Sequence, residues 1–164
     1  MQYVYKKSED AKRHLRMTVK AIQLDDLLNA AWYDLTAKGL TPSDYHMHLE
    51  RNAYANSIIG DLYYLKPLLI NATEYAMKNS KNDPISLIVD DVSMQYDLPA
   101  IYKNEAKKSL RIVLTNNCNL RLPKKIYAPY ENDVGKENLV PQALRNNIRI
   151  VKAHFGFFDY QKSK

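Results

Sequence analysis

The sequence predicts an α+β protein, a two-layer α/β sandwich in which helices pack on one face of a mixed sheet. Apolar residues recur at helical spacing in three separate segments, and short β-rich runs lie between them. The composition agrees, because 46% of the 164 residues are hydrophobic and 26% are charged. This chain is long enough for one core and too short for two ordinary domains.

Capping residues and stop signals place the helices. A polar helical stretch is expected over residues 7–17. Asp25 is expected to cap a helix that runs to about Ala37, because Gly39 and Pro42 follow it.

Two further helices follow later in the chain. Asp61 is expected to cap a long helix that ends near Asn79. A last helix is expected to begin near Pro141, since apolar residues recur there at positions 144, 148 and 151.

Strands are expected where apolar and polar residues alternate or where β-branched residues cluster. The expected strands are residues 45–50, 57–59, 85–90, 110–114 and 155–160. The third and fourth of these are expected to be neighbours in one sheet. Residues 98–108 are expected to form a short helix or an ordered loop, and residues 123–128 one helical turn.

Asn71 is the most informative residue, because it lies beside the apolar stripe of the helix that Asp61 caps. A buried amide needs hydrogen-bond partners, so this asparagine either holds a ligand or is satisfied within the protein. Tyr75 and Lys78 follow about one and two turns later. Each has an alternative interpretation, Tyr75 as a core residue and Lys78 as an exposed cation.

The distribution of charge, the cysteine content and the length of the apolar runs indicate which partners and which compartment to expect. The net charge is +6, but lysines and arginines are interspersed with acidic residues, and no basic run alternates with aromatics. A nucleic-acid interface is therefore not predicted. The single cysteine, Cys118, fits a reducing cytoplasm. No apolar run approaches the ~18 residues of a membrane span.

Seven segments, in this order and spacing, carry a family resemblance. They are KKSEDAKRHLRM, IQLDDLLNAA with LTAKGL, SIIGDLYYLKPLLINATEYAMKNS, PISLIVDD, SLRIVLTNN, KKIYAPYEND and IRIVKAHFGFFDYQKS. Together they resemble the catalytic ATP-binding domain of bacterial sensor histidine kinases, which has the Bergerat-type ATPase fold. The resemblance implies that residues 18–164 form this domain. Residues 1–17 are then the end of a dimerisation-type helix or an N-terminal extension.

The resemblance implies a site for ATP and Mg²⁺. Asn71 then supplies the oxygen that binds the magnesium bridging the nucleotide phosphates, a task suited to an amide. Tyr75 and Lys78 face the phosphates or the nucleotide. Thr115 or Asn116 takes the place of the aspartate that binds the adenine amino group. The implied partner is a response regulator or a histidine-bearing dimerisation domain, with a homodimer possible.

The chain departs from the family where the nucleotide should be held. The loop after residue 115 has Asn117 and Asn119 in place of glycines, and residues 131–144 contain a single glycine where the family has a glycine-rich lid. Pro67 interrupts the helix that carries Asn71. Since phosphoryl transfer depends on positioning, the departures predict a domain that has lost or nearly lost ATP binding and serves as a docking, scaffold or phosphotransfer module.

By resemblance the chain is a protein histidine kinase domain, expected to be inactive alone, and no catalytic residue is assigned. The alternative is a competent ATP-binding domain of a divergent sensor histidine kinase that phosphorylates a histidine.

Overall fold

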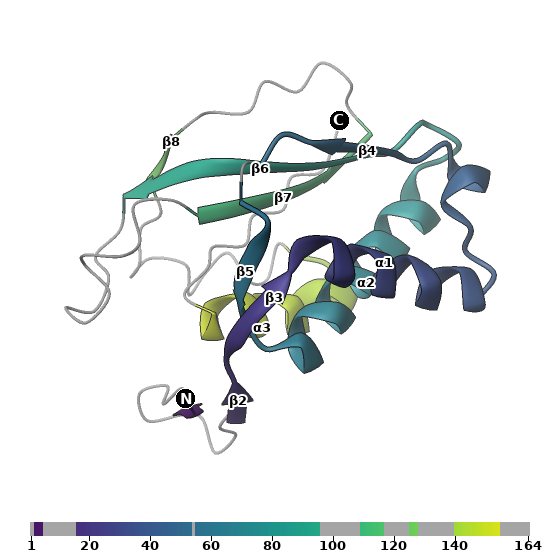
Figure 1. Ribbon diagram of the computed structural model, residues 1–164. Coiled ribbons are helices and arrows are strands. Elements are labelled where there is room, and N and C mark those ends of the chain that lie inside the picture. Colours follow the sequence, from purple (N-terminus) through teal and green to yellow (C-terminus); the bar gives the residue numbers. More distant parts are fainter. Residues whose placement is uncertain are drawn as a thin grey trace.

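The chain folds as an α+β protein, seen in the computed structural model of Figure 1. The structure describes residues 2–4, 16–53, 55–95, 109–116, 125–127 and 140–154. The helices within these ranges are α1 (Leu24–Ala37), α2 (Leu62–Asn79) and α3 (Arg145–Ala153), with 3₁₀ turns η1 (Pro42–Tyr45) and η4 (Gln142–Leu144).

The main sheet is mixed and is built around one long strand. Its strands are β4 (His48–Arg51), β6 (Ser86–Gln95), β7 (Ser109–Thr115) and β8 (Lys125–Tyr127). Strand β6 pairs in parallel with β4 and antiparallel with β7, and its far end pairs in parallel with β8. The prediction that residues 85–90 and 110–114 are sheet neighbours is confirmed.

Two smaller antiparallel pairs are separate from the main sheet. Strand β1 (Gln2–Val4) pairs with β2 (Arg16–Thr18), and β3 (Lys20–Gln23) pairs with β5 (Ser57–Gly60). The expected helix over residues 7–17 is wrong at its end, because residues 16 and 17 are held in β2 by pairing with β1. Most of the remaining residues of that prediction lie outside the described ranges. Strand β3 was not predicted, whereas β5 matches the expected strand 57–59.

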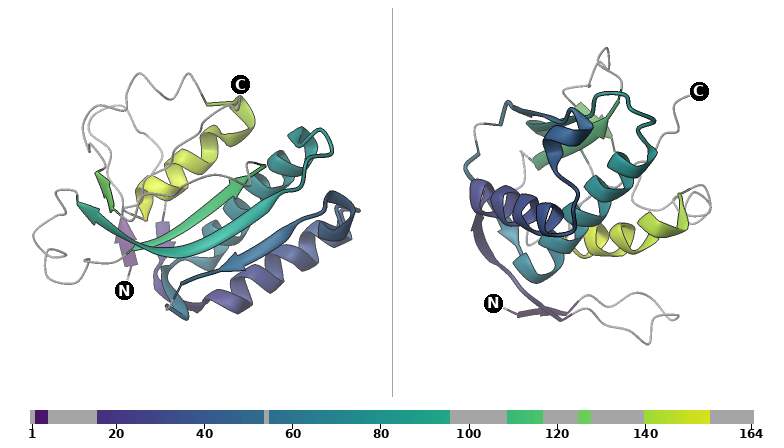
Figure 2. Two further views of the ribbon diagram at one scale, coloured as in Figure 1. Left: turned by 90° about the horizontal axis from the view of Figure 1, so that it is seen from above. Right: turned by 90° about the vertical axis from the view of Figure 1, so that its right-hand side faces the viewer.

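Helices α1 and α2 cover one face of the main sheet, which gives two layers (Figures 1 and 2). The shared core takes its fully buried side chains from α1, α2 and β6, with β7 packed against it. These side chains include Leu27, Leu35, Leu69, Leu87 and Val89. On β6 the residues that face the helices alternate with half-buried ones, as a strand with one face on a core requires.

The start of α1 differs from the prediction, whereas the start of α2 confirms it. The cap of α1 is Gln23, which makes no side-chain bond to the helix. The backbone N–H of Leu24, the first residue of α1, donates to the carbonyl of Asn56 at 2.8 Å. Asp25 lies inside the first turn. Asp61 caps α2, its carboxylate accepting from the backbone N–H of Tyr63 at 2.9 Å.

Three other expectations can be compared with the described residues. The expected strand over 45–50 is shorter, because Pro42 begins a 3₁₀ turn and His46 then adopts a left-handed conformation with φ of 47°. The helical turn expected over 123–128 is wrong, because Lys125–Tyr127 pairs with β6 as a strand. Residues 98–108 and 155–160 lie outside the described ranges.

Candidate functional site

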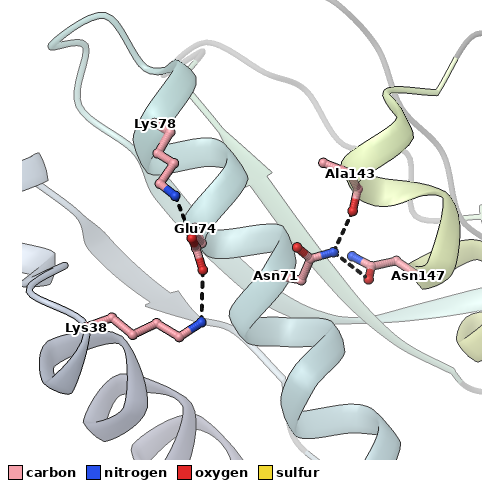
Figure 3. Close-up of polar contacts among 6 residues, drawn as sticks. All are labelled: Lys38, Asn71, Glu74, Lys78, Ala143 and Asn147. Carbon is pink, nitrogen blue, oxygen red and sulfur yellow. Dashed lines mark hydrogen bonds and ion pairs between the residues drawn. The ribbon is translucent and has the colours of Figure 1, made fainter.

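The side chain of Asn71 faces η4 and α3 and is bonded to both (Figure 3). Its amide nitrogen donates to the carbonyl oxygen of Ala143 at 2.8 Å and to Oδ1 of Asn147 at 3.1 Å. A peptide carbonyl can only accept, so the nitrogen of the Asn71 amide must be the atom on this side. The contact therefore fixes the orientation of the amide.

Asn147 is the second member of this contact, and sequence reasoning did not single it out. Only 1% of the residue is exposed. Its own amide nitrogen lies 3.4 Å from the carbonyl oxygen of Leu68, one turn before Asn71 in α2. Both ends of this buried amide thus have a partner on α2. The signal in the sequence was the spacing, since residue 147 falls on the same helical stripe as 144, 148 and 151.

Tyr75 is a partly buried packing residue on the same helix as Asn71. It lies against a small apolar cluster from the η4–α3 segment, made of Val140, Leu144 and Ile148. The interpretation of Tyr75 as a core residue agrees with this packing. Together the amides and this cluster hold the start of α3 against the middle of α2.

The side chain of Lys78 is directed at Glu74 and away from the amide of Asn71 (Figure 3). Its ammonium group binds Glu74 at 2.6 Å, and Lys38 of α1 binds the same carboxylate at 3.1 Å. Both hydrogen bonds lower the pKa of Glu74 below its ordinary value, and the bond from Lys78 has the larger effect. In this structure Lys78 belongs to an exposed ion-pair group that joins α2 to α1, which agrees with its interpretation as an exposed cation, and the role of Lys78 toward a nucleotide stays a prediction.

Thr115 and Asn116 lie near the far end of α2. Thr115 ends β7, and the amide of Asn116 lies 3.5 Å from the carboxylate of Asp83, in the turn after α2. The end of α2 is about 12 Å along the helix axis from Asn71. Within the described residues, the predicted adenine-contacting positions and the predicted metal ligand thus belong to different contacts.

The N-terminal end of α2 carries a second polar junction. Besides capping the helix, the carboxylate of Asp61 accepts from the backbone N–H of Thr18 in β2 at 2.6 Å. Its own N–H donates to Nε2 of His154 at 3.1 Å, and Nδ1 of the same ring lies 2.8 Å from the carbonyl of Ile150. Since that carbonyl only accepts, Nδ1 carries the proton and Nε2 is the acceptor.

Gly60 allows this junction to close. A Cβ atom at this position would lie 2.5 Å from a methyl group of Leu65 and 3.0 Å from the His154 ring. A side chain here would require the Leu65 methyl group and the His154 ring to shift. The C-terminal end of α3 is thus held against the N-terminal end of α2. The N-terminal end of α3 is held against the middle of α2 by the contacts of Asn71.

A hollow of about 430 Å³ opens at this same end of α2. Its lining includes the cations Arg16 and Lys20 and the rings of Tyr63 and Tyr64, and it does not include Asn71. Sequence reasoning missed it because the walls come from β2, β3 and α2, which only the tertiary fold brings together.

The chain matches no known protein-family model, and it has no significant match among curated proteins. In the part of the chain that the structure describes, no helix combines the length and the apolarity needed to cross a bilayer.

Proposed function

We propose that this chain is a degenerate histidine kinase-like ATPase domain that acts as a docking, scaffold or phosphotransfer module in a two-component phosphorelay. In this proposal the domain has the Bergerat-type fold but binds ATP weakly or not at all. Its partner is a response regulator or a histidine-bearing dimerisation domain.

The order of the elements supports the fold part of the proposal. The helix that carries Asn71 lies between β5 and β6, and β6 pairs with β7. These are the positions that the resemblance gives to the magnesium-binding helix and to the two central strands. The helices also lie on one face of a mixed sheet, as expected for this fold (Figure 1).

The contact of Asn71 with the η4–α3 segment is the observation that carries the loss of ATP binding. In the resemblance, this segment begins the helix whose backbone N–H groups hold the phosphates. Here the group nearest to Asn71 is the carbonyl of Ala143, at 2.8 Å. A carbonyl oxygen repels phosphate, and Oδ1 of the buried Asn147 accepts from the same amide nitrogen of Asn71.

The charged side chains that follow Asn71 in α2 form ion pairs of their own. Glu74, less than one turn further along α2, places a carboxylate on the helix, and its lowered pKa keeps it ionised at neutral pH. Both nearby lysines are already paired with it. Two ammonium groups share this one carboxylate, so the group keeps a net charge of +1, but both ammonium groups are directed at Glu74 and away from the Asn71 amide (Figure 3).

Calorimetric titration with Mg·ATP tests the proposal. We expect no binding heat up to millimolar ATP for the wild-type chain. Two variants serve as a matched pair, Asn71→Ala at the candidate ligand and Asn29→Ala at an exposed position of α1. Micromolar binding that Asn71→Ala abolishes and Asn29→Ala preserves would overturn the proposal in favour of the competent kinase domain.

The docking part needs a separate measurement. Receiver domains of response regulators from the source organism can be immobilised one at a time and tested for binding by interferometry. We expect at least one to bind with micromolar affinity and to compete with its own histidine-bearing partner. If every receiver domain fails to bind, the scaffold role is wrong even where ATP binding is absent.

A further inference from the structure

Among the strands that the structure describes, β4 forms an edge of the main sheet (Figure 2). It lies beside β6 on the side away from β7, and all four of its residues are exposed. An edge strand presents unpaired backbone groups that can pair with another chain. The question is what could pair with this edge.

The backbone of β4 shows which groups are open. The N–H groups of His48 and Asn52 bond to carbonyls of β6 at 2.8 and 2.7 Å. In a parallel ladder, alternate residues of one strand bond to the neighbour, so the backbone groups of Leu49 and Arg51 point away from β6. Those of Leu49 lie at the middle of the free edge.

The side chains of β4 favour one way of pairing. Leu49 is 49% exposed and belongs to a small set of large apolar residues exposed in the described part of the chain. If two β4 strands meet antiparallel with Leu49 opposite itself, His48 lies opposite the partner's Glu50. Neither His48 nor Glu50 makes an ion pair within the described residues, so both side chains can contact a partner.

Other registers are less favourable. Only a shift by whole pairs keeps the open backbone groups of both strands facing each other. The next such register toward the C-terminus places Glu50 opposite the partner's Glu50, which is destabilising. Short, charged edge strands normally resist pairing, but in the Leu49 register a ring N–H of His48 can donate to the carboxylate of the partner's Glu50.

We propose that β4 is a self-association edge, through which two copies of this chain join their main sheets antiparallel about Leu49. The two leucines exchange backbone hydrogen bonds and pack against each other, and His48 of each copy binds the partner's Glu50. Because only four residues form the strand, the dimer is weak and forms at high protein concentration. This inference does not depend on the proposed function.

Sedimentation velocity over a range of protein concentrations tests the proposal. The apparent mass should rise from 19.0 kDa toward twice that value as the concentration increases. Leu49→Lys should weaken association by about tenfold or more, because it removes the apolar pair and opposes two cations. Ile59→Lys is the matched control, since Ile59 is 66% exposed on β5 and lies outside this edge.

A charge exchange tests the register. Glu50→Lys should weaken the dimer because it faces the partner's His48, and the double variant His48→Glu with Glu50→Lys should restore it. In a Cys118→Ser background, Leu49→Cys should form an intersubunit disulfide, since Cα atoms of such a pair lie about 5.5 Å apart. Ile59→Cys should not.

Three outcomes would overturn the proposal. The first is a wild-type chain that stays monomeric at every concentration. The second is a dimer that Ile59→Lys disrupts and Leu49→Lys leaves intact. The third is association that persists when circular dichroism shows the Leu49→Lys variant folded. Rescue by the charge exchange, together with Leu49→Cys cross-linking, supports the stated register.

Discussion

Helix α2 meets α3 at two polar junctions, and the two differ in how their residues find partners. At the start of α2, Asp61 caps its own helix through a residue two positions away. In the middle of α2, Asn71 finds its partners 72 and 76 residues away. The first role is local and follows from residue type, whereas the second exists only once the sheet and helices have assembled.

An asparagine on the apolar stripe of a helix can be satisfied within the protein and need not bind a metal or other ligand. A capping aspartate has its partner built into the adjacent backbone. An amide on an apolar stripe needs a partner from elsewhere, which can be a metal, a ligand or another amide. Here the described partners of Asn71 are a carbonyl and an amide of the same chain.

Removing Asp61 should produce the largest effect. Asp61→Ala deletes the helix cap and the 2.6 Å bond to the backbone of Thr18, and we expect the free energy of unfolding to fall by about 3 kcal/mol. Urea denaturation measures it. Asp26→Ala, at an exposed position in the first turn of α1, is the control and should change stability by about 0.5 kcal/mol or less. If the two variants lose the same free energy of unfolding, the bonds of Asp61 stabilise the protein no more than an ordinary first-turn carboxylate does, and the prediction is wrong.

The amide junction should show coupling between its two members. Asn71→Leu and Asn147→Leu should each lower the free energy of unfolding by about 2 kcal/mol, because each leaves polar groups without a partner. The double variant replaces both amides, so its loss should fall short of the sum by about 1 kcal/mol. Additive losses in this double-mutant cycle would show that the two amides do not act together.

The ion pairs of Glu74 should give the smallest effect and the clearest pH dependence. Glu74→Gln should lower the free energy of unfolding at neutral pH by about 0.5 kcal/mol, since the group lies near the surface. The folded-state pKa is lowered, so the contribution is complete above the ordinary pKa of glutamate and is lost as pH falls through the lowered value.

Thermal unfolding of wild type and Glu74→Gln from neutral to acid pH should therefore converge. Glu50→Gln, at a residue that makes no ion pair in the described part of the chain, should show no such convergence when measured at low protein concentration. A difference that grows toward acid pH would contradict the assigned sign.

The parts of the fold that depend on local patterns could be predicted from the sequence. The spans of α1 and α2, the cap at Asp61 and the pairing of β6 with β7 follow from periodicity, capping and β-branched runs. Strands β3 and β8 could not be predicted in this way. Each is three or four residues long, and pairing with a distant strand fixes its conformation.

The residues of the candidate site also fall into two groups, those whose role follows from the local sequence and those whose role depends on the tertiary structure. The polar character of position 71 could be predicted, and so could the packing role of Tyr75. The sharing of Glu74 between Lys78 and Lys38 could not, because it depends on the placement of Lys38 in another helix. The role of Asn147 also required the tertiary structure, although its spacing offered a signal.

The position of β6 between two other strands determines which amide hydrogens should exchange slowly with solvent. Over Ser86 to Val89 it is bonded on both sides, to β4 and to β7, and its side chains at 87 and 89 are fully buried. Amide hydrogens there can exchange with solvent only when much of the sheet opens. Since β4 has one neighbour among the described strands and no buried residue, its amides should exchange first. The protein should thus open from its β4 edge inward, with the centre of β6 among the last parts to lose protection.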